Sequence, residues 1–244
     1  MSFLATIITA SIPFYNAYQT YKISSFKIPD SWRKYQFHPS QETIDFANLC
    51  GVRGQDVQFF HGTLYGDVAR AYGNNSIPES DIAIVMDTAL VTFEPSNEND
   101  TMRCAANAII RHEYTHIRNN DTFTRSCLRT IASTAAAVLG VSLLNPLPSL
   151  LLTSIASVAS HYLYSQFIER RADDAAIKAS NKQELLAFHE ILKQDQTNNL
   201  LMRQSQDLKA KFMISPKGDY RFHPTHPPIS SRIAKVEKAL SQLD

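Results

Sequence analysis

A long stretch without charged side chains constrains the fold of this chain more than any other feature. Residues 130–168 contain no Asp, Glu, Lys or Arg, although charged residues make up 19% of the chain. Such a stretch is stable when it is buried, either in a protein core or in lipid. The segment Leu144-Asn145-Pro146-Leu147-Pro148 lies near its middle and must interrupt any helix. The sequence therefore predicts a central hairpin of two apolar helices.

The uncharged hairpin is compatible with two environments, a lipid bilayer and a protein core. Each arm has about 16–18 residues, at the short end of the roughly 20 that span a bilayer. We expect a membrane-associated chain with the hairpin integral to the bilayer; the alternative is a soluble cytoplasmic chain that buries the hairpin in its core. Residues 1–40 form an N-terminal segment. Its first 21 residues are uncharged but lack a basic start and contain Pro13, so we expect a membrane-facing or ordinary helix and no secretory signal.

The composition excludes several classes of function. The chain carries 24 basic and 23 acidic side chains, for a net charge of +1, so a nucleic-acid surface, which needs a clustered basic excess, is not expected. No glycine-rich loop is followed by the Lys and Ser or Thr that a nucleotide needs. The three cysteines form no CxxC pair and are expected to be reduced thiols.

The rest of the chain alternates between helical patterns and two short strands. Alternating apolar residues predict a strand over residues 81–87, directly before a helical pattern. An exposed edge of that strand could bind an extended peptide. The fold class is therefore mainly α (α+β), with a small β-sheet beside a helix. The expected helices cover residues 41–49 (N-cap Ser40), 100–119, 169–195 and 229–243, and the expected strands cover residues 57–61 and 81–87.

His112-Glu113-Tyr114-Thr115-His116 is an HExxH motif. Residues four apart lie on one face of a helix, so His112 and His116 can bind the same zinc ion. Glu113 projects toward the adjoining side, where it can take a proton from the attacking water as general base. The motif predicts one Zn²⁺ per chain.

A catalytic zinc needs a third protein ligand. The carboxylates of the later helices are candidates: Glu169, Glu184, Glu190 and Glu237. We favour Glu169 because it ends the uncharged stretch, where we expect it at the head of a helix that begins beside the buried site. Asp173 lies one turn later on the same face and could accept a hydrogen bond from a liganding imidazole.

Three sequence blocks resemble one known family. They are HEYTH followed by Ile117 and Asp121, Glu-x-x-Ala-Asp at 169–173, and Thr225-His226-Pro227-Pro228 ahead of Arg232. The order and spacing resemble the HtpX-like and CAAX prenyl endopeptidase group of gluzincins, metallopeptidase family forty-eight, over residues 81–240. The resemblance implies that His112, His116 and Glu169 bind zinc and that Glu113 is the catalytic base. We expect the peptidase domain to cover residues 41–244, after the N-terminal segment.

The expected reaction is hydrolysis of peptide bonds in protein or peptide substrates, with zinc activating the water. The alternative is a scaffold protein with a structural zinc or an inactive site. Structural zinc sites have four protein ligands, usually with cysteine, whereas only three ligands are evident here and the base is retained.

The oxyanion needs a further stabiliser. Four residues before the last helix are candidates: Tyr220, Arg221, His223 and His226. His226 is held by the prolines that follow it, and we expect its imidazole to face the zinc cleft. It would stabilise the oxyanion or close the site as a reversible fourth ligand; the alternative is that it only packs the start of the last helix.

Overall fold

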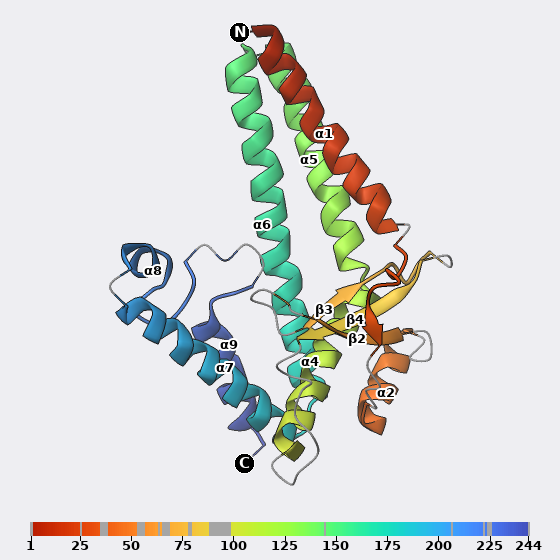
Figure 1. Ribbon diagram of the computed structural model, residues 1–244, viewed down its shortest axis with the longest axis vertical. Coiled ribbons are helices and arrows are strands. Elements are labelled where there is room, and N and C mark those ends of the chain that lie inside the picture. Colours follow the sequence, from red (N-terminus) through yellow and green to blue (C-terminus); the bar gives the residue numbers. More distant parts are fainter. Residues whose placement is uncertain are drawn as a thin grey trace.

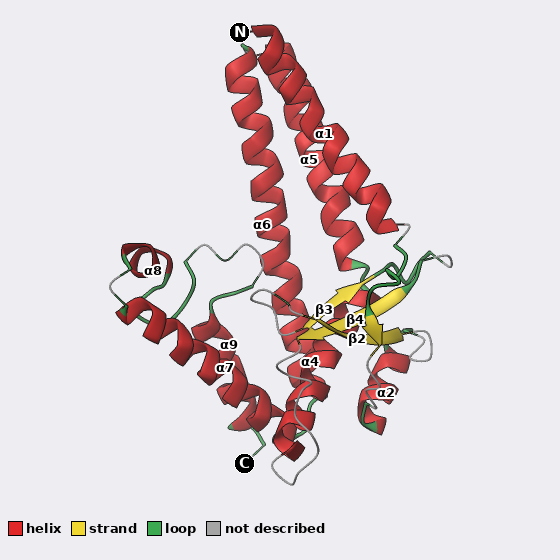
Figure 2. Ribbon diagram, in the orientation of Figure 1, coloured by secondary structure: helices red, strands yellow, loops and turns green. Residues whose placement is uncertain are grey.

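The computed structural model describes residues 2–24, 26–34, 39–52, 57–62, 64, 69–77, 80–87, 99–143, 145–205, 207–221, 223 and 226–243. Helices dominate this part of the chain (Figures 1 and 2). Their bounds are α1 Ser2–Ser24, α2 Gln41–Leu49, α4 Asn99–Arg118, α5 Asp121–Leu143, α6 Pro146–Ala179, α7 Lys182–Gln204, α8 Leu208–Met213 and α9 Ile229–Leu240. The predicted class, mainly α with a small sheet, is confirmed.

The sheet has four strands in the order β1-β2-β4-β3. The strands are β1 Arg33–Lys34, β2 Val57–Gly62, β3 Ala69–Tyr72 and β4 Ile82–Asp87. β4 pairs in parallel with β2 and antiparallel with β3. The expectation that β4 offers a free edge to a peptide is therefore wrong. All its residues except Asp87 are buried, which is typical of a central strand.

α4 is the central helix of the molecule. One of its faces packs Ala106, Ile110 and Tyr114 into a core with the sheet and α2. Another face packs Ala108 and Ile109 against α7 and α9. Because both faces are buried, the middle of α4 is held rigidly, and side chains at its C-terminal end have fixed positions.

Three long helices project away from this body (Figure 1). We call α1, α5 and residues 146–165 of α6 the stalk. α5 and α6 form an antiparallel hairpin, and α1 packs against both. The break expected near Pro146 is confirmed, with Asn145 as N-cap and Pro146 at the first position of α6.

α6 does not end where the charged residues begin. It runs without interruption from Pro146 through Glu169 to Ala179, so Glu169 lies in mid-helix and not at a helix head. The chain breaks later, at Ser180 and Asn181, where Asn181 and Glu184 form a capping box that starts α7. The change from apolar to charged sequence marks the exit of α6 from the stalk, and the backbone continues through it.

Candidate metal centre

The residues of the HExxH motif and the later carboxylate come from two packed helices. His112, Glu113 and His116 lie on the C-terminal half of α4, and Glu169 lies on the part of α6 that packs against α4. The one-turn spacing on α4 directs both imidazoles to the same side. The two helices therefore bring together side chains that are more than fifty residues apart.

Three side chains converge closely enough to share one ion. The Nε2 atoms of His112 and His116 are 3.0 Å apart. Glu169 Oε2 lies 3.3 Å from His112 Nε2, and Glu169 Oε1 lies 3.4 Å from His116 Nε2. One ligand atom from each residue falls within 4.8 Å of the other two.

These separations fit a tetrahedral zinc site. Ligand atoms about 2.0–2.1 Å from a tetrahedral ion are about 3.3 Å from one another. Two imidazole nitrogens and one carboxylate are the ligand set of many catalytic zinc sites, which leave the fourth position for water or substrate. His112, His116 and Glu169 would hold the ion.

Each imidazole has a carboxylate behind it. His116 Nδ1 lies 2.8 Å from Asp121 Oδ2. His112 Nδ1 lies 3.0 Å from Asp173 Oδ1, although its alignment is poorer than a hydrogen bond requires. Such outer carboxylates orient a liganding imidazole and raise its basicity.

The two outer carboxylates are themselves held by arginines. Arg232 of α9 donates from Nε and Nη2 to the two oxygens of Asp173, at 2.9 and 2.8 Å. Arg171 pairs with Asp121. Asp121 and Arg232 were expected only as parts of the family pattern, without a role. Their signal was present in the sequence: Asp121 lies five residues after His116, and Arg232 follows the block that contains His226.

The charges of the centre favour a cation. Burial raises the pKa of Glu169, but three neighbouring imidazoles hold it well below its usual range. Burial lowers the pKa of His116, but Asp121 and Glu169 raise it to about 10. The pKa of His112 is likewise raised against the effect of burial by Asp173 and Glu169. Carboxylates thus attract positive charge to the place where a divalent cation would replace the protons.

Glu113 is placed beside the cluster but does not belong to it. Its side chain is only 6% exposed, yet it forms no hydrogen bond or ion pair with any described residue. An ionisable group in this position is available for proton transfer.

His226 lies at the rim of the cluster. Its Nδ1 is 2.8 Å from Glu169 Oε2, and its carbonyl oxygen accepts a hydrogen bond of 2.8 Å from Gln166 Nε2. Its backbone N–H donates to His223 Nδ1 at 3.0 Å. His226 is thus fixed onto α6 beside the three converging side chains.

The other carboxylates considered as third ligands lie elsewhere. Glu184 is buried in an ion pair with Arg111 and caps α7. Glu190 is exposed, and Glu237 pairs with His189 and Lys193 on the surface. The structure brings only Glu169 of these four to the two histidines.

Three comparisons relate the chain to known proteins. The model of peptidase family M48 matches residues 75–240, which is more than half of the chain. A search of curated protein sequences found no match to the chain. Among solved structures, Ste24p from S. mikatae is similar, with 16% identity and a TM-score of 0.47 over 96% of this chain and 61% of that protein. The chain thus spans about three fifths of the length of Ste24p. By the family match, the chain belongs to peptidase family M48.

Proposed function

We propose that the chain is a zinc metalloendopeptidase with a single zinc site formed by His112, His116 and Glu169. The observation that carries the proposal is the convergence of these three side chains next to a buried carboxylate, Glu113, that has no partner among the described residues. A structural zinc site would have a fourth protein ligand and no need for a base.

Each residue of the site has a separate role in the proposed hydrolysis. Bound zinc supplies a Lewis acid that polarises the scissile carbonyl and makes water more acidic. Glu113 takes the proton of the attacking water and passes it to the leaving amine. Asp121, next to Nδ1 of His116, keeps that imidazole in the tautomer that would present Nε2 to the ion, and the carboxylate of Asp173 lies behind the imidazole of His112. His226 donates to the developing oxyanion.

The catalytic unit in this proposal is residues 41–244, and its substrates are proteins or peptides. The third ligand is tested by comparing Glu169→Ala with Glu190→Ala. Removing one of three ligands should reduce the zinc content well below one per chain and abolish hydrolysis of casein, and zinc added back should not restore it. Glu190 is an exposed glutamate on α7, so Glu190→Ala should leave both the zinc content and the hydrolysis of casein unchanged.

Zinc is measured by mass spectrometry on the purified variants, and circular dichroism checks their fold. Loss of zinc from Glu190→Ala with full zinc in Glu169→Ala would refute the ligand assignment. One zinc in the wild type with no hydrolysis of any unfolded protein would favour the scaffold alternative.

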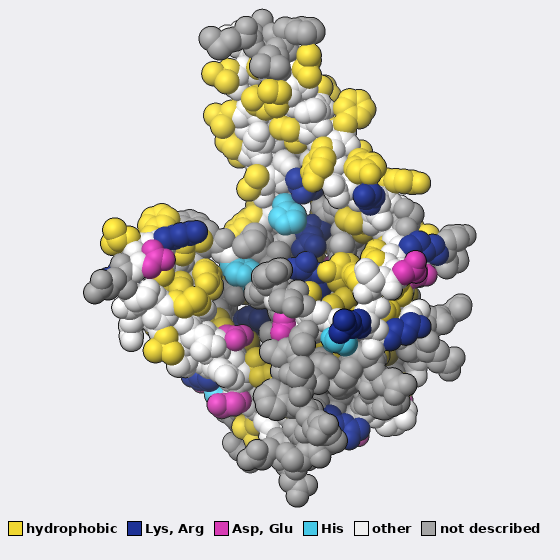
Figure 3. Space-filling model, in the orientation of Figure 1, with side chains coloured by type: hydrophobic (Ala, Val, Ile, Leu, Met, Phe, Trp, Pro, Cys, Tyr) yellow, Lys and Arg dark blue, Asp and Glu magenta, His cyan; other side chains and the backbone are white. Residues whose placement is uncertain are grey.

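We also propose that the stalk lies in a membrane. Its exterior is apolar, with exposed side chains such as Val138, Leu151 and Val158, and hydrophobic side chains recur along the face of the stalk seen in Figure 3. Its interior is polar: Asn16 donates to Ser133 and Ser157, at 2.9 and 3.2 Å.

This distribution is the reverse of that in a water-soluble bundle, and it is typical of helices that pack in lipid through small and polar residues. By length and composition, α5 is the described helix that is long and apolar enough to cross a bilayer. In the bilayer the stalk would hold the metal centre close to the membrane surface.

A further inference from the structure

Two arginines extend into the stalk at its base. Arg125 and Arg129 lie one turn apart on α5 and point toward α6, where Arg125 Nη1 is 3.4 Å from Ser165 Oγ and Arg129 Nε is 3.0 Å from Ser157 Oγ. A hydroxyl group accepts a hydrogen bond but does not neutralise a guanidinium. Among the described residues, no carboxylate lies within ion-pair distance of Arg129.

His161 lies beside the positive cluster of Arg125 and Arg129. It is on α6 between the two serines, close to both guanidinium groups, where its ring can add a hydrogen-bond donor to their positive charge. All three side chains are only half-buried, so a ligand can reach them. In Figure 3, basic side chains gather where the stalk meets the body of the molecule.

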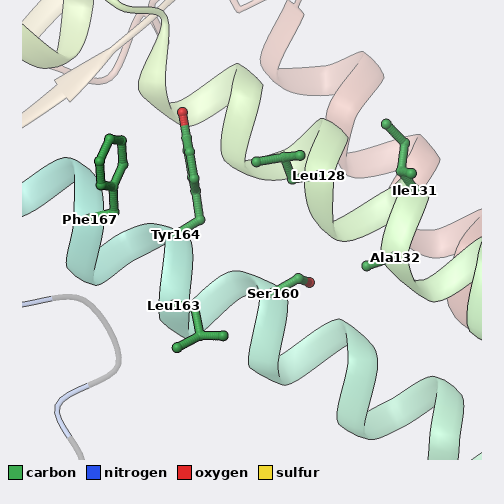
Figure 4. A pocket seen from close by; sticks show the side chains of 7 residues that line it. All are labelled: Leu128, Ile131, Ala132, Ser160, Leu163, Tyr164 and Phe167. Atoms are coloured by element: carbon green, nitrogen blue, oxygen red, sulfur yellow. The ribbon is translucent and has the colours of Figure 1, made fainter.

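An apolar groove adjoins this cluster. It has a volume of about 420 Å³ and lies between the same two helices, with Tyr164 rising from α6 beside the turn of α5 that carries Leu128 (Figure 4). Its apolar lining comprises Leu128, Ile131 and Ala132 of α5 and Leu163, Tyr164 and Phe167 of α6. Leu128 precedes Arg129, so the groove and the positive cluster share the same turns.

The position of the two arginines along the stalk indicates which kind of ligand they would meet. From Arg129 to Leu143 α5 rises about 21 Å, which is less than the ~30 Å hydrocarbon core of a bilayer. On the proposed placement of the stalk, on which this inference rests, the guanidinium groups lie at the end of the stalk next to the body, near the headgroups of one leaflet. Long arginine side chains near the ends of membrane helices extend to this region, where lipid phosphates attract positive charge.

We propose that Arg125, Arg129 and His161 bind the phosphate of an anionic phospholipid, whose acyl chain occupies the adjoining groove. Guanidinium groups bind phosphate through paired, charge-assisted hydrogen bonds. The apolar groove then accommodates the chain that continues from the headgroup. Ser165 lies one turn before Glu169 on α6, so the bound lipid is a neighbour of the metal centre.

The test uses the full chain in a non-ionic detergent and follows thermal unfolding. Dioctanoyl phosphatidylglycerol should raise the Tm saturably, by roughly 3–6 °C at ten times its Kd. Dioctanoyl phosphatidylcholine and inorganic phosphate should each raise it by less than about 1 °C at the same concentration. An equal shift with phosphatidylcholine, or with phosphate alone, would overturn the proposal in favour of general lipid binding or of a free-anion site.

Matched variants assign the effect to the cluster. The double variant Arg125→Gln/Arg129→Gln should weaken phosphatidylglycerol binding at least about tenfold, the effect expected on losing charge-assisted contacts. Lys22→Gln removes an exposed cation from the last turn of α1 and should leave binding unchanged. Zinc content and circular dichroism verify the fold of each variant. If the double variant is misfolded, Arg129→Gln alone should still weaken binding measurably.

Two further measurements separate the lipid proposal from substrate binding and from the membrane placement. If Arg129→Gln leaves the lipid shift intact but raises KM for acidic peptides, the cluster binds substrate and the lipid proposal fails. Alkaline carbonate extraction of the wild type tests the membrane placement separately. A chain that stays in the membrane without preferring the anionic lipid contradicts this inference alone, whereas a chain extracted with soluble proteins contradicts the placement on which it rests.

Discussion

Glu169 and His226 meet at the rim of the metal centre, 2.8 Å apart between Oε2 and Nδ1. The contact places the ring of His226 directly beside this carboxylate. An imidazole held in this way can donate to an oxyanion that forms beside the metal ligands. The hydrogen bond from Gln166 to the carbonyl of His226 fixes the loop that carries the ring.

We therefore expect His226→Ala to lower kcat by roughly a hundredfold, the loss typical of removing an oxyanion donor, while zinc content stays at the wild-type level. Steady-state hydrolysis of a fluorogenic peptide measures the effect. His189→Ala is the control, because His189 lies on α7 and pairs with Glu237 on the surface. An increase in kcat for His226→Ala would indicate that the ring closes the site as a fourth ligand and would contradict its role as a donor.

At this scale, the sequence predicts the parts of the centre that depend on local spacing. His112, Glu113 and His116 need only one helical turn, which four residues define. The outer contacts could not be predicted from spacing alone. Arg232 reaches Asp173 across 59 positions, and that contact depends on how α9 packs against α6.

α6 is the element in which the sequence was most misleading. Its apolar first half and charged second half suggest two helices, yet the hydrogen-bonded backbone is continuous through Glu169. The change in composition reflects a change in surroundings, which a helix can cross without breaking. The true end of α6 carries local signals instead, namely the capping box of Asn181 and Glu184.

β4 shows a second limit of local patterns. Its alternation predicts the strand correctly but not its neighbours, because β3 is short and carries a weak strand pattern. Pairing with both β2 and β3 buries β4 beside α4. β4 therefore helps to position α4 and offers no free edge to a peptide.

α5 and α6 approach each other closely at Gly140. A Cβ at this position would lie 3.0 Å from both Cα and Cβ of Ser149, so a larger side chain must push the backbones apart. Gly140→Leu should destabilise the hairpin by about 1–3 kcal/mol through overpacking, although leucine is the better helix former. The change is measured as a fall in Tm in detergent.

Val138→Leu is the matched control, because Val138 is exposed on the same helix and its replacement should have little effect. If Gly140→Leu raises the Tm, helix propensity dominates and the two helices are not closely packed at this point.

The body of the molecule has a buried apolar core, whereas the stalk exposes apolar side chains on its exterior (Figure 3). The uncharged stretch in the sequence predicts the hairpin, but it does not predict that α1 joins it. That arrangement depends on contacts such as Thr20 with Ser126, 2.7 Å apart between hydroxyl oxygens. Isolated polar residues in α1 give no local signal of these partners.

We expect the chain to remain in the membrane pellet after alkaline carbonate extraction. Leu151→Lys should reduce the inserted fraction, because a lysine at the centre of a membrane helix costs about 2.5–3.5 kcal/mol. Leu201→Lys, at a similarly exposed leucine on α7, should have no such effect. The two fractions are compared by immunoblotting. Release of the wild type into the supernatant, or equal insertion of both variants, would contradict the membrane placement.

The most direct test of the proposed chemistry is zinc content and peptide hydrolysis measured together on Glu113→Gln. Glu113 lies beside the ligands without belonging to them, so the variant should keep one zinc per chain and an unchanged circular dichroism spectrum. Its kcat should fall at least about a hundredfold, because the general base is lost. Turnover within about tenfold of the wild type, with zinc retained, would contradict the role of Glu113 and with it the proposed mechanism.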